Sequence, residues 1–344
     1  MTATAALTLQ QRDAIVQRVN NLVVTKVLHP GFNAQTWNNQ NDRLLAAREI
    51  DDPFDFRHHV DGLIKSLHLS DATFVHQSER PSIPKGVAAR YQYCTPKECN
   101  PAYTQASAAG DVFYSELRSN VGWVKITKFP GAVGIDMARQ ITKAIEEVGK
   151  SGRLIIDLRG NAGGGLSFLR VMSLLTPGRV PVGYSVTRKR FDRGYTKESL
   201  RQFNWIPKSK IGLYSLVVKF AAGDDSVSVI TEGLGAKPWH RRTVLLVDQY
   251  TTGAGERIAA FAQENKLAPV IGSKTAGRLI CCSWYDAGFE HFLRLPARLW
   301  LTWTDRQLEE LGINPDVSVP MECRDERSDY DAQLEKAIET VSSL

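Results

Sequence analysis

The chain has 344 residues, long enough to bury a sizeable core and to form one large domain or two modest ones. Apolar residues make up 43% of the chain and charged residues 23%, as in ordinary soluble globular proteins. The net charge of +6 is spread over scattered Lys and Arg residues, with short basic runs only at 188–190 and 240–242. Such runs are too small for a nucleic-acid footprint, so we expect no nucleic-acid partner.

Targeting signals and metal motifs are equally sparse. No apolar run reaches 18 residues and the N-terminus lacks the pattern of a signal peptide, so we expect no membrane partner and a cytoplasmic location. Five cysteines, an odd number, fit a reducing compartment better than a disulfide framework. Cys94 and Cys99 have no second pair of ligands beside them, so neither a metal nor another cofactor is expected. The sequence leaves a homo-oligomer open.

The first 70 residues read as three amphipathic helices, at 8–25, 34–48 and 53–67. Thr8 and Gln11 have the spacing of a capping box at the first of them. Residues 70–76 then read as a loop entering a strand. We therefore expect an N-terminal helical domain over 1–75.

Residues 76–120 read as a strand-and-loop linker, with a strand at 87–93, in place of a full PDZ insert. From residue 121, strands alternate with helices. Strands are predicted at 122–127, 154–158, 244–247 and 268–272, and helices at 135–148, 166–175 and 256–264. This rhythm predicts an α/β class core over 121–344, a sheet at least partly parallel with crossover helices on its faces.

Two further parts of this core are distinctive. Residues 185–240 are polar and aromatic and read as a surface insertion. Alternation at 289–295 and at 299–303 predicts two strands that pair with each other, giving a β-rich extension near the C-terminus. The tail over 325–344 reads as a terminal helix.

Two glycine-rich turns, 161–165 and 251–255, each follow a buried strand and precede a helix. In an open α/β sheet such turns lie at the carboxyl ends of strands, where ligands bind. Neither has the spacing of a phosphate-binding loop. Two such turns that meet could instead point backbone N–H groups at one oxygen, as an oxyanion hole does.

Four segments in this order carry a resemblance: Leu-Ile-Ile-Asp-Leu-Arg-Gly-Asn-Ala-Gly-Gly at 154–164, Thr-Thr-Gly-Ala-Gly-Glu at 251–256, Ile-Gly-Ser-Lys-Thr-Ala-Gly-Arg at 271–278 and Gly-Ile-Asn-Pro-Asp-Val at 312–317. Together they resemble the tail-specific, or carboxy-terminal processing, serine peptidases, the clan that includes the tricorn core. The resemblance covers about residues 55–320. It implies a ClpP/crotonase-like crossover fold and a peptide or small-molecule substrate.

The resemblance also implies positions for the catalytic groups. The nucleophilic serine of the family falls on Gly253, which has no side chain with which to attack. The oxyanion hole would take the N–H of Ala254 and that of Gly163 or Gly164. The lysine base of many members falls on Arg278, which stays protonated and cannot accept a proton, and the histidine base of others falls on Asp71. Because nucleophile and base both depart from the family, we expect natural divergence.

Other residues could replace the missing groups. Thr252 is beside the apex but should point elsewhere, and Cys281 and Cys282 follow Arg278 closely enough to face the cleft. His76 could reach the cleft, although a lone histidine is usually structural.

Two charged residues of the motifs have other candidate roles. Glu256 is expected to support the helix N-terminus rather than catalyse, and Arg278 could clamp a carboxylate.

Three functions remain open from the sequence. The first is a diverged serine-type hydrolase, the second is a pseudopeptidase that binds peptides without cutting them, and the third is an enzyme that cyclises or isomerises a small metabolite. All three would use the same amide-lined turns.

Overall fold

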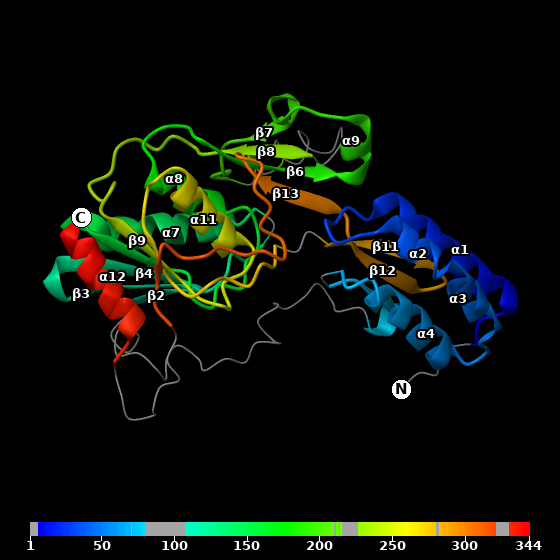
Figure 1. The fold of residues 1–344 in the computed structure, drawn as a ribbon. Helices are drawn as coiled ribbons and strands as arrows, with labels where there is room; N and C mark the ends of the chain where they lie inside the picture. Colours follow the sequence, from blue (N-terminus) through cyan, green and yellow to red (C-terminus); the bar gives the residue numbers. More distant parts are fainter. Residues whose placement is uncertain are drawn as a thin grey trace.

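The computed structural model describes residues 6–69, 71–79, 107–131, 133–209, 211–212, 214, 226–279, 282–320 and 330–344. Two units stand side by side, with the N-terminal helices at one end of the molecule and the C-terminal helix at the other (Figure 1). No helix within these residues is both long and apolar enough to cross a membrane.

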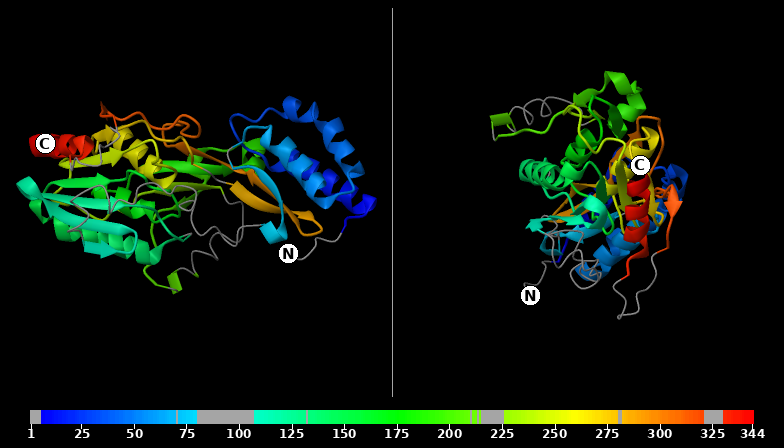
Figure 2. Two further views of the ribbon diagram at one scale, coloured as in Figure 1. Left: turned by 90° about the horizontal axis from the view of Figure 1, so that it is seen from below. Right: turned by 90° about the vertical axis from the view of Figure 1, so that its left-hand side faces the viewer.

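The N-terminal unit combines four helices with a three-stranded sheet. Its helices are α1 (Leu9–Lys26), α2 (Ala34–Asn38), α3 (Asn41–Ala46) and α4 (Pro53–Lys65). Its antiparallel sheet has the order β1 (Thr73–His76), β12 (His291–Pro296), β11 (Cys282–Gly288). Two of its three strands therefore come from residues 282–296 and lie beside the N-terminal helices (Figure 2). Helices and sheet share one apolar core.

The capping box predicted at Thr8 and Gln11 is present in both directions at the start of α1, and the helix over 53–67 is confirmed as α4. The single helix predicted over 34–48 is wrong. It breaks between α2 and α3 at Asn39 and Gln40, because asparagine is a poor interior helix residue. The strand expected at 87–93 lies outside the described residues.

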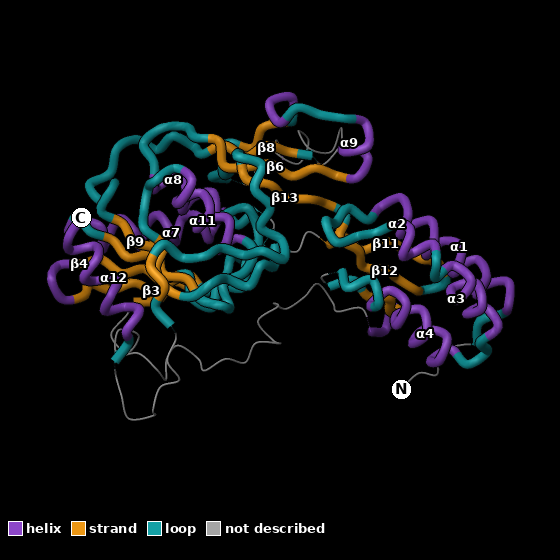
Figure 3. Tube along the Cα trace, in the orientation of Figure 1, coloured by secondary structure: helices purple, strands orange, loops and turns teal. Residues whose placement is uncertain are grey.

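The second unit is built on a seven-stranded sheet with the order β14-β10-β9-β5-β4-β3-β2. Its members are β2 (Ser107–Ala109), β3 (Val112–Leu117), β4 (Val121–Ile126), β5 (Leu154–Asp157), β9 (Thr243–Val247), β10 (Val270–Gly272) and β14 (Val317–Ser318). The five strands from β14 to β4 are parallel, and β3 and β2 extend the sheet in antiparallel fashion. This is the mixed, crossover α/β core expected from the sequence (Figure 3).

Helices cover both faces of this sheet. One face packs against α7 (Ile135–Val148), α8 (Phe168–Leu175) and α11 (Ala254–Glu264) in the largest apolar core. The other face packs against the C-terminal helix α12 (Ala332–Ser343). The first part of the predicted terminal helix, 325–329, lies outside the described residues.

The predicted insertion and the late strands form a second small sheet. Its order is β13 (Arg298–Thr302), β6 (Pro181–Thr187), β8 (Val227–Ile230), β7 (Arg201–Phe203), and the short helix α9 (Arg188–Arg193) follows β6. The expectation that 289–295 and 299–303 pair with each other is therefore wrong. The chain turns between β12 and β13, and the two strands join sheets in different units.

Candidate functional site

An elbow at Gly253 connects β9 to α11, and α11 begins at Ala254, two residues earlier than the sequence predicts. Gly253 has φ 51° and ψ −104°, a conformation that residues with a Cβ adopt only under strain. A Cβ built there would lie 3.4 Å from the Gly163 Cα and 3.7 Å from the Arg278 carbonyl oxygen, which are ordinary contacts. The elbow thus has the strained shape of a nucleophile turn and room for a side chain, but carries none.

The two glycine-rich turns meet at this elbow. A Cβ on Gly163 would lie 3.4 Å from the Gly253 Cα and 3.5 Å from the Ala254 nitrogen. Thr252 binds the first turn twice, since its backbone N–H and its hydroxyl both donate to the Asn161 carbonyl, at 2.9 and 3.1 Å. The meeting of the turns is therefore held by hydrogen bonds.

The N–H groups of these turns differ in what they bind. The Gly163 N–H donates to the Asn161 side-chain oxygen at 2.9 Å, which removes Gly163 from the expected donors. For Gly164 and Ala254, the structure gives no hydrogen-bond acceptor among the described residues. Gly164 has φ 128°, and a Cβ there would lie 2.0 Å from the Phe129 carbonyl oxygen, so only glycine fits. Two unpaired amides thus flank the elbow at Gly253.

Glu256 binds the elbow to the segment 275–278. Its carboxylate is fully buried and accepts four hydrogen bonds. They come from the Gly253 N–H at 2.9 Å, the Thr275 hydroxyl at 2.7 Å, the Gly277 N–H at 2.6 Å and the Arg278 N–H at 3.0 Å. The sequence predicted support of the helix N-terminus. The structure shows a wider role, because one side chain connects two loops.

Burial raises the pKa of Glu256, while its hydrogen bonds with Thr275, Gly277, Gly253 and Arg278 oppose that shift. Four donors fill the acceptor sites of a carboxylate, which leaves no oxygen lone pair for a proton. The geometry therefore fits the ionised side chain, held by hydrogen bonds in the interior.

The threonines of the turn are already engaged. The Thr251 hydroxyl is buried and donates to the Leu158 carbonyl at 2.9 Å, and it also contacts Asp248. Thr252 is bound to Asn161 as described. Neither hydroxyl is both exposed and hydrogen-bonded to a general base, as a relocated nucleophile would be.

Arg278 lies at the elbow through its backbone. Its carbonyl oxygen accepts from the Gly253 N–H at 2.9 Å, and its side chain is exposed. The structure thus brings the Arg278 backbone to the site.

The expected base positions belong to the N-terminal unit. Asp71 precedes β1 and forms an ion pair with Arg294 of β12 at 3.6 Å. His76 is buried, and its Nδ1 lies 2.8 Å from the Ser78 hydroxyl and its Nε2 3.4 Å from the Glu290 carboxylate. The contacts of both residues lie within this unit, and none of them connects to the elbow.

Cys282 is half-buried at the start of β11, and Cys281 lies outside the described residues. Cys282 lines a small pocket at the junction of the two units, together with His29, Leu279 and Glu309. Among the described residues no group of three His, Cys, Asp or Glu side chains is arranged to hold a metal ion.

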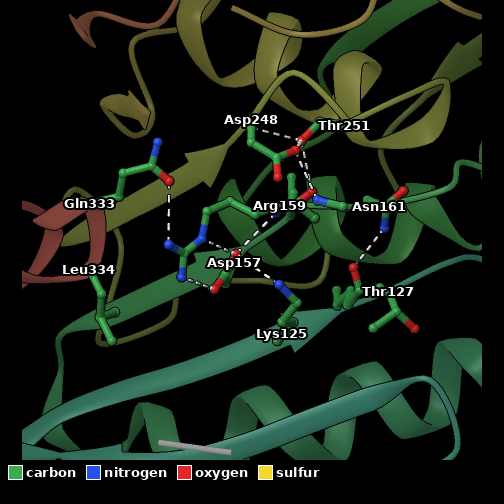
Figure 4. A network of polar contacts seen from close by, with 12 residues as sticks. Lys125, Thr127, Asp157, Arg159, Asn161, Asp248, Thr251, Gln333 and Leu334 are labelled. Carbon is green, nitrogen blue, oxygen red and sulfur yellow. Dashed lines mark hydrogen bonds and ion pairs between the residues drawn. The ribbon is translucent and has the colours of Figure 1, made fainter. Parts of the chain in front are cut away.

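A buried ionic network, which was not predicted from the sequence, lies at the ends of β4 and β5 (Figure 4). The Lys125 Nζ lies 3.6 Å from Asp157, and the Arg159 guanidinium binds both Asp157 and Asp331, at 2.7 and 2.9 Å. Desolvation lowers the pKa of Lys125, with Asp157 opposing. Burial alone would raise the pKa of Asp157, but the charges of Arg159 and Lys125 lower it to about 2. The only sequence signal was the Asp-Leu-Arg motif at 157–159.

The chain matches known proteins over its α/β core. Residues 120–319 match the model of peptidase family S41. The carboxy-terminal processing protease CtpA of Bacillus subtilis (strain 168) is 27% identical over 216 residues, 61% of this chain and 38% of the relative. The chain thus aligns with about two fifths of that protein.

Solved structures share the fold at low identity. A structure from Parabacteroides merdae ATCC 43184 has a TM-score of 0.66 and 15% identity and covers 97% of both chains. The photosystem II D1 C-terminal processing protease has a TM-score of 0.54 and 12% identity, covering 91% of this chain and 94% of that one.

Proposed function

Because this chain belongs to peptidase family S41, we propose that its elbow binds a carbonyl or carboxylate oxygen of a peptide without attacking it. The observation that supports this proposal is the pair of unpaired amides, Gly164 and Ala254, beside the strained glycine elbow at Gly253. The positive end of α11 adds to the attraction for a partly negative oxygen. The site then works as an oxyanion hole without a nucleophile.

The contacts around the elbow favour binding over hydrolysis by a relocated group. The Thr252 hydroxyl donates to a backbone carbonyl, and Arg278 cannot accept a proton from a nucleophile. Asp71 has Arg294 as its ionic partner, in the N-terminal unit.

Selective labelling of the amides tests the binding. The protein is labelled with ¹⁵N-glycine and ¹⁵N-alanine and titrated with acetyl-trialanine, once as the free acid and once as the C-terminal amide. We expect the Gly164 and Ala254 resonances to shift with saturation, while the Gly163 resonance, already bonded to Asn161, shifts less. Unchanged Gly164 and Ala254 signals at millimolar peptide would refute the proposal.

Fluorophosphonate and iodoacetamide treatment tests the absence of a nucleophile. The expected result is no fluorophosphonate adduct and no peptide cleavage, and alkylation of a cysteine should leave peptide binding intact. Cleavage that is lost in Thr252→Val, or after alkylation of Cys281 or Cys282, would instead identify a relocated nucleophile. The double revertant Gly253→Ser with Asp71→His tests the descent, since a folded double revertant that stays inactive counts against a decayed peptidase.

A cyclisation or isomerisation of a small metabolite would use the same amides, and it predicts that acetyl-trialanine fails to bind while a small carbonyl compound shifts both signals. The cytoplasmic location, the lack of a nucleic-acid partner and the oligomeric state remain predictions from the sequence.

A further inference from the structure

The segment 27–31, which follows α1, lies where the chain crosses between the two units, and its Leu28 packs with Tyr184 and Val186 of β6 in the second unit. The Leu28 N–H donates to the Pro296 carbonyl at 2.9 Å. His29 lies next to it and lines the junction pocket with Leu279 and Glu309. Only 3% of the His29 side chain is exposed, so its polar atoms need protein partners.

The tautomer of the neutral His29 ring follows from its contacts. Its Nδ1 accepts the Gly31 N–H at 3.1 Å, so the neutral ring carries its proton on Nε2. This Nε2 has no hydrogen-bond partner within the described residues. It faces the Glu310 and Glu309 carboxylates, at 3.7 and 3.9 Å. A buried donor is thus directed at two acidic side chains of the second unit.

These two glutamates hold the segment that borders the elbow. Glu309 accepts the Leu279 N–H at 2.8 Å through its other carboxylate oxygen. The Glu310 N–H donates to the Gly277 carbonyl at 2.7 Å. The Gly277 N–H donates in turn to the Glu256 carboxylate at 2.6 Å.

Glu256 completes the connection, because its second oxygen accepts the Gly253 N–H. Three hydrogen bonds, through Gly277 and Glu256, therefore connect Glu310 to the elbow at Gly253. His29 precedes Gly253 by more than 200 positions in the sequence, so only the fold joins them.

We propose that His29 is a positioning residue for the elbow, and that the seating of the N-terminal unit thereby regulates ligand binding at Gly164 and Ala254. Loss of the His29 ring removes the group facing the Glu309 carboxylate, which then turns toward the pocket and releases Leu279. The segment 275–279 loosens, and Glu256 loses the partners that fix the elbow. The regulatory half of this inference rests on the proposed function.

Amide hydrogen exchange measured by mass spectrometry on the full chain tests the connection, with acetyl-trialanine binding as the second readout. The test variant is His29→Ala, and His29→Gln restores an N–H donor on a side chain of similar reach. The matched control is Arg188→Ala. Arg188 also contacts this segment, through the Val27 carbonyl at 3.3 Å, but within the described residues it contacts neither Glu309 nor Glu310. Glu310→Gln approaches the same contact from the second unit, and its half-exposed side chain favours a folded variant.

We expect His29→Ala and Glu310→Gln to speed exchange in peptides covering 275–279 and 253–256 and to weaken peptide binding, each by about 2- to 30-fold. His29→Gln should recover part of both effects, and Arg188→Ala should change neither. Unchanged exchange in His29→Ala, or an equal change in Arg188→Ala, would overturn the positioning role. Faster exchange in a protein that binds no acetyl-trialanine would leave the positioning role standing and refute the proposed function instead.

Discussion

Replacement of Gly253 by alanine tests whether a side chain at the elbow is disfavoured by backbone strain or by lack of room. The side chain would have ordinary neighbours at 3.4 and 3.7 Å, so the cost comes from the backbone, whose φ is 51°. Strain of this kind costs about 1–3 kcal/mol. With an unfolding entropy of roughly 0.7 kcal/mol per kelvin for a chain of this length, Tm should fall by about 1–4 °C.

Two other glycines calibrate that result. In Gly160→Ala nothing lies within 4 Å of the new Cβ, and at φ 66° the change should cost about 1 kcal/mol. In Gly164→Ala the Cβ would lie 2.0 Å from the Phe129 carbonyl oxygen, so the variant should lose more than about 4 kcal/mol or fail to fold. The measurement is urea unfolding followed by tryptophan fluorescence.

The order of the losses in unfolding free energy among the three variants shows whether strain or lack of room acts at Gly253. If Gly253→Ala were as damaging as Gly164→Ala, the elbow would have no room for a side chain and could not be a vacated nucleophile position. If Gly253→Ala were neutral, the strained elbow itself would be refuted.

Three further predictions follow from the buried polar groups. Glu256→Ala leaves three donors without an acceptor, because the Gly253 N–H keeps the Arg278 carbonyl. At about 1–3 kcal/mol each, urea unfolding should show a loss of at least about 3 kcal/mol, and a loss under about 1 kcal/mol would contradict the hydrogen-bond geometry. The folded-state pKa of Asp157, about 2, lies below its ordinary 3.8, so it contributes stability above pH 3.8 that is lost as the pH falls through 2. When the free energy of unfolding is measured as a function of pH, this loss should be about 2 kcal/mol. Asp157→Asn should abolish this part of the pH dependence, and an unchanged pH profile would exclude Asp157 as its source. Asp331→Ala removes the N-cap of α12, where Asp331 accepts the Leu334 N–H at 3.0 Å, and it also removes an ionic partner of Arg159. It should therefore lower the free energy of unfolding by about 2–4 kcal/mol. Limited proteolysis should cut α12 faster in Asp331→Ala than in the matched variant Glu339→Ala, and equal rates would refute this anchoring role.

Local signals predicted much of the fold. Thr8 and Gln11 indicated the start of α1 because a capping box is made within four residues. The alternation of apolar strands and helices after residue 121 indicated the crossover core for the same reason, since each element carries its own periodicity. The glycine-rich turns were identified as neighbours because carboxyl ends of parallel strands share one edge of a sheet.

What the sequence missed depends on contacts between distant residues. The pairing of β12 with β1 joins positions more than 200 residues apart, and no local pattern specifies such a partner. Lys125 fits the alternation of a half-exposed strand, yet it is buried because Asp157 supplies its counter-charge. Whether Gly163 or Gly164 has a free N–H depends on where one asparagine side chain points, which periodicity does not encode.

The pairing of β1 with β12 also has a consequence for synthesis on the ribosome. The helices α1 to α4 emerge early, but the strands that complete their core extend to Pro296. At about 5–20 residues per second, translation takes roughly 10–45 s to proceed from the end of β1 to that point. During this interval the apolar faces of the nascent helices remain uncovered, so the newborn chain should depend on holding chaperones until its later strands arrive.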